Sequence, residues 1–255
     1  MYQPKFTPIS ALNSTLHCDQ AWSQSRLPAC FNVLTWNLHK IDFSHFTHRP
    51  IESLLPIEPP HILSLQEATI IHSASASHRF FDLPFVMAPN LQTAKRQAGV
   101  LTASSSFLRG QQQCLTQSRE LGFLTHKTAL ITHHTLACGQ NLIHVNIHAI
   151  NFVSHRVFAH ELQQLWNHLA HSTQALIISG DFNTWNPTRL KTLLNATQQL
   201  NLSQVAYPDT RPIKTLMRQP LDHIFYRGLQ LTSAQALNVP SLSDHNPLIA
   251  QFCQP

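Results

Sequence analysis

Apolar and polar residues alternate along several short segments of the chain, a pattern typical of strands with one buried face. The clearest is NVLTWNL at residues 32–38. Similar short strands are predicted at 62–66, 99–103, 128–133, 142–147, 222–226, 230–239 and 247–252. Residues 175–179 (ALIIS) are apolar almost throughout and predict a further strand, which runs directly into Gly180 and Asp181.

Helical periodicity is confined to a few places. Five apolar residues follow one another at helical spacing and form a single face: Phe158, Leu162, Leu165, Trp166 and Leu169. A second helix is predicted to open at 186–187, where Asn caps the helix and Pro occupies its first turn, and to continue to residue 194. A short helix over 46–55 is expected to end at the prolines that follow it.

Many strands with only a few helices predict an α/β sandwich, and the regular alternation argues against an all-parallel sheet. The chain of 255 residues has no linker, repeat or low-complexity tract, so one main domain is expected over residues 31–255. Residues 1–30 show no clear period and are interpreted as an irregular N-terminal extension.

The composition is poor in charge, at 11% of residues, so the 18 histidines are expected to contribute much of the polar surface. Solvent exposure is the expectation for His72, His78, His133 and His134. The net charge of +5 suits a polyanionic substrate such as nucleic acid or an anionic headgroup, although basic surfaces also serve solubility.

The five cysteines (Cys18, Cys30, Cys114, Cys138 and Cys253) are scattered and form no zinc-type pattern. Reduced thiols in a cytoplasmic protein are therefore expected, with a Cys18–Cys30 bridge as the open alternative. The N-terminus lacks the charged and apolar regions of a signal peptide, and no window resembles a membrane span. We expect a cytoplasmic monomer, and no protein partner is indicated.

Polar residues gather where the predicted strands end: Asn37, Glu67, His148, Asp181, Asn183, Asp222, Asp244 and His245. Carboxylate and amide oxygens suit Mg²⁺ or Mn²⁺ rather than zinc. A metal that neutralises phosphate charge, an activated water and an acid for the leaving group are what phosphoester hydrolysis requires. Each segment taken alone is more typical of an ordinary turn, so the hypothesis depends on their joint occurrence.

The series N…QE…H…GDFN…LDH…SDHNP resembles the endonuclease/exonuclease/phosphatase superfamily, which includes deoxyribonuclease I. The resemblance runs from about residue 32 to 252. The segments VNIHAINF, PLDHIFYRGL and SDHNPLIAQF are most similar to its bacterial YafD-like branch. The resemblance implies a four-layered α/β sandwich in which two mixed β-sheets pack face to face with helices outside.

The resemblance also implies a role for each of these residues. Glu67 would be the principal metal ligand, with Asn37 beside it and Asp244 in or near the same coordination sphere. Asp181 would orient and deprotonate the attacking water, and Asn183 would bind the scissile phosphate. His245 would contact the phosphate or transfer protons, Asp222 would orient the His245 ring, and His148 would be the leaving-group acid.

Five further residues have two open interpretations. His223 stands where the family usually has an aromatic residue, and it either joins the site or packs as an aromatic ring would. Trp185 either stacks on a base or packs beneath its loop. Three basic residues (Lys127, Arg156 and Arg218) either reach a phosphate or lie on the surface.

The sequence therefore predicts a hydrolase acting on phosphoester bonds, with a nuclease as the first hypothesis because of the basic charge. A phosphatase or phosphodiesterase acting on phosphoinositides, sphingolipid headgroups or small phosphoesters is the second hypothesis. A non-catalytic binding module is the third, and it is disfavoured because all of the implied acid, base and metal residues are present.

Overall fold

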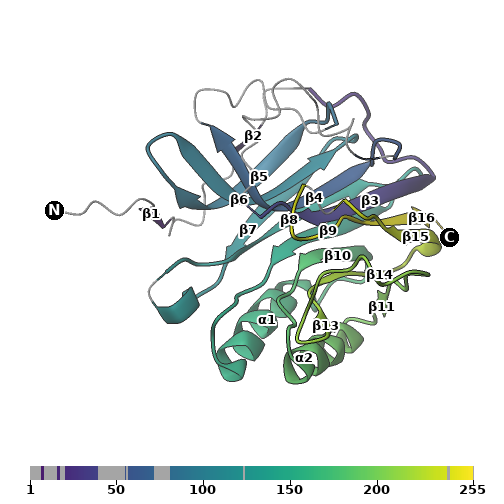
Figure 1. The fold of residues 1–255 in the computed structure, drawn as a ribbon. Helices are drawn as coiled ribbons and strands as arrows, with labels where there is room; N and C mark the ends of the chain where they lie inside the picture. The colour runs from purple at the N-terminus through teal and green to yellow at the C-terminus, as the bar shows by residue number, and fades with distance from the viewer. Residues whose placement is uncertain are drawn as a thin grey trace.

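The computed structural model describes residues 7–8, 16–17, 21–39, 55, 57–71, 81–122, 124–239 and 242–254. Two mixed β-sheets lie face to face, and the chain crosses between them after β6 and again after β14 (Figure 1). Each sheet contains one parallel pair, β3 with β4 and β9 with β10, and its other pairs are antiparallel. This arrangement confirms the predicted sandwich of two mixed sheets.

The first sheet has the strand order β1-β5-β6-β4-β3-β16-β15, with β2 also paired to β5. Its strands are β1 (Thr7–Pro8), β2 (Leu16–His17), β3 (Cys30–Asn37), β4 (Ile62–Ile71), β5 (Phe85–Gln92), β6 (Arg96–Ser104), β15 (Gln230–Ala236) and β16 (Leu248–Cys253). The second sheet has the order β11-β14-β10-β9-β8-β7. Its strands are β7 (Gly110–Leu115), β8 (Thr128–Thr135), β9 (Asn141–His148), β10 (Ala175–Asp181), β11 (Ser203–Gln204) and β14 (Asp222–Arg227). Strands β12 (Thr215–Leu216) and β13 (Gln219–Pro220) form a separate small hairpin.

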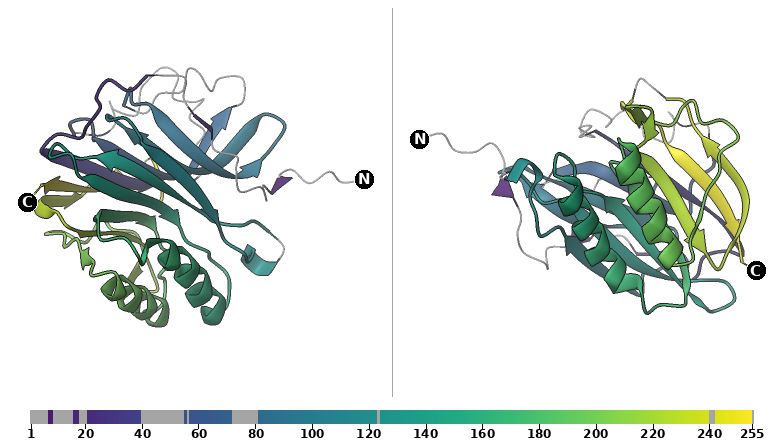
Figure 2. Two further views of the ribbon diagram at one scale, coloured as in Figure 1. Left: turned by 180° about the vertical axis from the view of Figure 1, so that it is seen from behind. Right: turned by 90° about the horizontal axis from the view of Figure 1, so that it is seen from below.

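Two α-helices, α1 (His155–Leu169) and α2 (Pro187–Gln199), cover the outer face of the second sheet (Figure 2). The predicted apolar face of α1 is buried in the core beneath this sheet, together with apolar residues of β8, β9 and β10. Asn186 caps α2, and Pro187 occupies its first turn, as predicted, although the helix runs five residues beyond 194. The helix predicted over 46–55 falls almost wholly outside the described residues. Among the residues described, no helix is long and apolar enough to cross a membrane.

A layer of buried polar residues, which we call the polar seam, joins the two sheets. It consists of Thr35, Ser64, Gln66, Thr102 and Ser104 from the first sheet and Thr132, His134, His144, Asn146 and Ser179 from the second. The Ser64 hydroxyl lies 2.8 Å from His144 Nε2 and 2.9 Å from Ser179 Oγ. Gln66 Nε2 donates to Asn146 Oδ1 across the interface at 2.7 Å. The sheets are therefore held in register by specific hydrogen bonds as well as by apolar contact.

The expectation that His134 is exposed is wrong, because this side chain is completely buried in the polar seam. Its ring nitrogens lie 3.1 Å from Thr132 Oγ1 and 3.4 Å from Ser104 Oγ. His133, on the opposite side of β8, is partly exposed. His72 and His78 lie outside the described residues.

The expectation of reduced thiols is wrong for Cys30 and Cys253, which form a disulfide. They occupy paired positions in the register of β3 and β16, so strand pairing brings them together despite a sequence separation of 223 residues. The alternative Cys18–Cys30 bridge is excluded because Cys30 is already paired. Disulfides are typical of oxidising compartments, so the thiol argument for a cytoplasmic location does not hold.

The segment before β3 is less irregular than its sequence indicates. The two-residue strands β1 and β2 both pair antiparallel with β5 at the edge of the first sheet. Leu27 is buried in the core between the sheets, and its backbone N–H donates to the carbonyl of Thr135. The segment 21–29 is therefore attached to the domain through Leu27, while most of its side chains are exposed.

Candidate active site

Three adjacent strands bring three of the predicted residues into one row. Asp181, the last residue of β10, is in register with His148 at the end of β9 on one side and with Asp222 at the start of β14 on the other. Gly180 permits this approach, because a Cβ at that position would overlap the carbonyl group of Ile147 on β9. The glycine of the GDFN segment thus places the Asp181 carboxylate at the edge of the sheet.

The first sheet contributes Asn37 and Glu67 to the same edge. Asn37 ends β3, and its Nδ2 donates to Asp181 Oδ2 across the sheet interface at 2.9 Å. Glu67 was expected at the end of its strand, but β4 continues to Ile71 and holds Glu67 at a break in register between Leu65 and Ala68. Its φ of 53° is unusual for a residue other than glycine. Such backbone conformations concentrate at functional sites.

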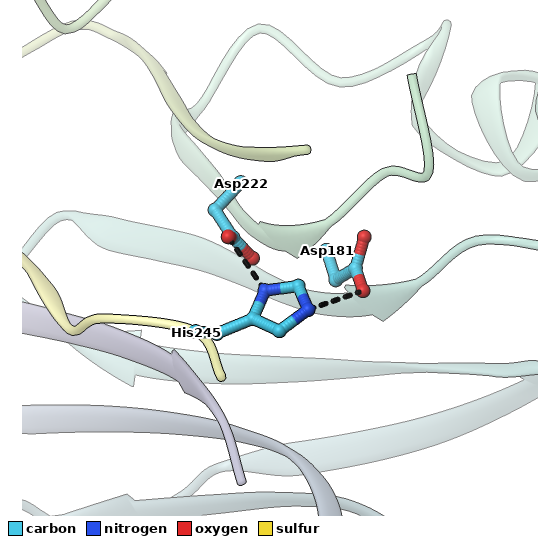
Figure 3. A group of neighbouring side chains, drawn as sticks. All are labelled: Asp181, Asp222 and His245. Atoms are coloured by element: carbon cyan, nitrogen blue, oxygen red, sulfur yellow. Dashed lines mark hydrogen bonds and ion pairs between the residues drawn. The ribbon is translucent and has the colours of Figure 1, made fainter. Parts of the chain in front are cut away.

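The loop before β16 delivers His245 to this row of residues (Figure 3). Trp36 Nε1 donates to the carbonyl of His245, and Ser243 Oγ donates to the carbonyl of Asn37, so the loop is tied to the end of β3. His245 Nδ1 donates to Asp222 Oδ2 at 2.8 Å, while its Nε2 lies 3.9 Å from Asp181 Oδ2. The His245 ring therefore stands between two buried carboxylates.

This arrangement controls the charges at the site. Burial opposes a charge on His245, but Asp222, Asp181 and Asp244 together raise its pKa to about 9. Burial and the neighbouring Asp222 raise the pKa of Asp181 to about 6, against the opposing effect of His245. At neutral pH the site thus holds a charged imidazole beside a carboxylate whose pKa suits proton transfer.

His148 and Lys127 form the other side of the site. His148 Nε2 lies 3.8 Å from both Asp181 Oδ2 and Glu67 Oε1. Lys127 Nζ lies 3.1 Å from His148 Nε2 and 3.9 Å from Glu67 Oε1. The structure thus brings together seven of the eight predicted residues (Asn37, Glu67, His148, Asp181, Asn183, Asp222 and His245) and adds Lys127 to them.

Asp244 is the predicted residue that lies apart from this buried group. Its side chain is 44% exposed, and Lys214 Nζ donates to its Oδ2 at 3.0 Å. His39 Nδ1 lies 3.4 Å from Oδ1. The adjacent His245 points inward, and successive residues of this loop face in different directions, which accounts for the exposure of Asp244.

The sequence of this protein matches the model of the "Endonuclease/Exonuclease/phosphatase family" over residues 34–245. The chain belongs to the endonuclease/exonuclease/phosphatase family. Members of this family are hydrolases that act on phosphoester bonds and depend on divalent metals. The match spans every residue of the site.

Solved structures share the fold at low sequence identity. The human nocturnin catalytic domain with bound sulfate is 20% identical (TM-score 0.61), with 89% of this chain and 95% of that chain covered. D. rerio TDP2 with a single-stranded DNA product is 16% identical (TM-score 0.65), with 88% and 99% covered. A mutant beta toxin from Staphylococcus aureus with bound magnesium ions is 13% identical (TM-score 0.56), with 88% and 99% covered. These similarities establish the family's sandwich fold for this chain.

The donor chemistry of the site fits the divalent metal on which the family depends. Glu67, Asn37 and Asp181 offer carboxylate and amide oxygens, the ligands preferred by Mg²⁺ and Mn²⁺. Ligand atoms of Asp181, Asp222 and His245 lie within 4.8 Å of one another. However, His245 Nδ1 and Asp222 Oδ2 are hydrogen-bonded to each other. Glu67 and Asp181 therefore fit a hard cation better than the hydrogen-bonded pair of Asp222 and His245 does.

Asn183 and the buried Arg189 stabilise the loops beside Asp181. The Asn183 backbone N–H donates to Asp181 Oδ1, and its Nδ2 donates to the carbonyl of Ala149, each at 2.9 Å. Arg189 donates to the carbonyls of Asn183, Ile150 and Val153. Arg189 was not among the predicted site residues, because an arginine in the first turn of a helix resembles an exposed residue.

The other four candidates either pack inside the protein or lie on its surface. His223 is buried, stacks on Phe225 and contacts the edge of Phe182, so it packs as an aromatic ring would. Trp185 Nε1 donates to Asn151 Oδ1, and its ring lies against the Arg189 guanidinium. Arg156 and Arg218 are exposed.

Proposed function

We propose that this protein is a divalent-metal-dependent phosphoester hydrolase that cleaves phosphodiester bonds in nucleic acid. The observation that carries the proposal is the buried arrangement of His245 between Asp222 and Asp181. The cationic imidazole of His245 can bind an anionic phosphate. The Asp181 carboxylate, whose pKa is raised, can accept a proton from water.

In this proposal Asp181 orients the attacking water and accepts its proton. His245, held charged by Asp222, donates a hydrogen bond to the phosphate. Asn183 adds a second donor, its side-chain amide, beside the phosphate once this side chain turns from the carbonyl of Ala149. His148 lies beside Asp181 and Glu67, and we place the leaving group on this side of the site.

Glu67 and Asn37, with Asp181 beside them, would hold the metal, which we propose to be Mg²⁺ or Mn²⁺. When bound, this ion would supply positive charge to the phosphate oxygens. Asp244 would join the ligands if Lys214 were displaced from its carboxylate. Asn37 Nδ2 donates to Asp181 Oδ2, which keeps the two side chains adjacent, and Asn37 would offer the metal its Oδ1, which also accepts from the backbone N–H of His39.

The preference for nucleic acid depends on two observations. The chain carries a net charge of +5, which favours a polyanion. The similar TDP2 structure holds a single-stranded DNA product. On the motifs quoted above we also propose membership of the bacterial YafD-like branch.

The test is hydrolysis by the purified protein of supercoiled plasmid, single-stranded DNA, single-stranded RNA, an inositol phosphate and sphingomyelin. Each substrate is incubated with Mg²⁺, with Mn²⁺ and with EDTA. Cleavage of a nucleic acid that EDTA abolishes supports the proposal. Metal-dependent hydrolysis of the inositol phosphate or sphingomyelin alone would replace the nuclease by a phosphatase or lipid phosphodiesterase. No hydrolysis of any of them would overturn the proposal.

A further inference from the structure

Lys127 is an enclosed cation on the His148 side of the candidate site. Its side chain is only 12% exposed, and its ammonium nitrogen lies 3.1 Å from His148 Nε2, 3.6 Å from Glu120 Oε2 and 3.9 Å from Glu67 Oε1. By contrast, the side chains of Lys95 and Lys191 are exposed to solvent. Lysine is rarely buried without a partner or a task.

The surrounding structure holds Lys127 in place. Its backbone N–H donates to Thr116 Oγ1, and its carbonyl accepts from the N–H of Thr116. Glu120 is buried and accepts a hydrogen bond from the backbone of Asn151. The ammonium group is therefore fixed by its own backbone and by a carboxylate that is itself immobilised.

The contact with His148 restricts what that imidazole can do. An ammonium group has donors and no acceptor, so Lys127 must donate its hydrogen bond to a lone pair on His148 Nε2. A nitrogen that accepts in this way carries no proton to give. In this arrangement the positive charge available to a leaving oxygen near His148 Nε2 belongs to Lys127.

We propose that Lys127 is a catalytic residue that stabilises the leaving oxygen, with His148 and Glu120 as its positioning residues. This inference rests on the proposed function. The water oxygen bonds to phosphorus and its proton passes to Asp181, while the bond to the leaving oxygen breaks. That oxygen keeps the electron pair and accepts a hydrogen bond from the Lys127 ammonium, and solvent supplies the proton that completes the alcohol.

A structural role for Lys127, in which it neutralises Glu120 and Glu67, makes a different prediction. Loss of a structural cation would slow all substrates alike. Loss of a group that stabilises the leaving oxygen penalises a poor leaving group far more than a good one, because p-nitrophenolate needs little help to depart. The dependence on the leaving group therefore separates the two roles.

The experiment compares two esters of thymidine 5′-phosphate, one with p-nitrophenol and one with the 3′-hydroxyl of thymidine (the dinucleotide TpT). Rates are measured with Mn²⁺ for the wild type, Lys127→Met, Lys127→Arg and the surface control Lys191→Met. We expect Lys127→Met to lose about 10²–10³-fold on TpT and much less on the p-nitrophenyl ester. Lys127→Arg should recover part of the loss on TpT, and Lys191→Met should match the wild type.

Equal losses on the two esters would overturn the role of Lys127 and leave the proposed function intact. Hydrolysis of neither ester by the wild type, together with no metal-dependent hydrolysis of the substrates tested under the proposed function, would overturn both. Thermal unfolding of each variant checks the fold, and Lys127→Gln replaces Lys127→Met if the latter does not fold.

Discussion

The polar seam and the active-site edge, where Asp181, Asp222 and His245 meet, both contain completely or almost completely buried histidines, yet these side chains are neutral in the polar seam and charged at the edge. In the polar seam, burial lowers the pKa of His144 to about 3 and that of His134 well below its usual value. At the edge, His245 is nearly as enclosed, but its pKa rises to about 9.

The difference lies in the partners. His144 is surrounded by the hydroxyls of Ser64, Thr132 and Ser179, which are neutral and satisfy a neutral ring. His245 faces the carboxylates of Asp222 and Asp181. Buried polar groups thus serve structure where their partners are neutral and become chemically active where their partners are charged.

The largest expected effect comes from removing a charge at the edge. Asp181→Asn should reduce metal-dependent hydrolysis by about 10²–10⁴-fold, because the water loses its base. The melting temperature should hold or rise, since Asp181 and Asp222 no longer repel each other. Ser179→Ala, two residues earlier on β10 in the polar seam, is the matched control and should keep most of the activity. An equal loss of activity in both variants would remove the functional distinction between the two regions.

The next largest effect should be a shift in the pH dependence of the hydrolysis rate. Asp222→Asn removes the leading cause that raises the pKa of His245, so that pKa should fall. If the charged imidazole is required, activity persists below this pKa and disappears above it. The alkaline limit of the rate profile should therefore move to lower pH, with a larger loss at pH 8 than at pH 6. A uniform loss across the pH range would argue that Asp222 does not act through His245.

The disulfide tests whether a structural feature far from the edge can be removed without loss of function. Cys30 begins β3, and Asn37 ends it, so the bridge lies at the opposite end of this strand from the site. Cys253→Ser should lower the free energy of unfolding by about 2–4 kcal/mol and leave the rate per folded molecule unchanged. Thermal unfolding with and without dithiothreitol measures the effect, with Cys138→Ser, at an exposed free cysteine, as the control. An unchanged wild-type melting temperature on reduction would contradict this expectation.

The smallest expected effect is the acid sensitivity of the polar seam. In the folded protein His144 stays neutral down to about pH 3, whereas in the unfolded chain it gains a proton below about pH 6.5. Its contribution to the free energy of unfolding is therefore complete above pH 6.5 and is lost as the pH falls toward 3. At pH 5 the loss attributable to His144 is about 2 kcal/mol. In urea unfolding, His144→Gln should have a lower free energy of unfolding than the wild type at pH 7. This difference should become smaller at pH 5. A gap of constant size would be the contrary result, and His168→Gln on the surface serves as the control.

Most of the longer strands and both α-helices followed from the sequence because each depends on local periodicity, but β5 and β7 were not predicted, and β4 and α2 run beyond their predicted ends. Which face of each strand is buried could not be predicted from the sequence. In β8 and β9 the polar residues alternate with apolar ones, which shows that the two faces differ but not that the polar face is the one between the sheets. His134 was therefore assigned to the surface although it is buried in the polar seam.

The candidate residues were found from their order along the chain, but their geometry depends on register between distant strands. The row formed by His148, Asp181 and Asp222 arises from two different pairings, one parallel and one antiparallel. The same limitation hid the Cys30–Cys253 bridge. Lys127 lies before a strand, with no local pattern to show that it faces His148, and its place in the site emerges only when β8 and β9 are paired.

Carboxylate partners turn the buried His245 at the edge into a charged group, while neutral partners keep the buried histidines of the polar seam uncharged. The most direct test is an NMR titration of the imidazole nitrogens in metal-free buffer, with His245→Gln and His144→Gln to assign the signals. We predict that His245 stays protonated through neutral pH and titrates near pH 9, and that His144 stays neutral at pH 5. Titration of both rings near pH 6.5 would show that their buried partners do not set their charge.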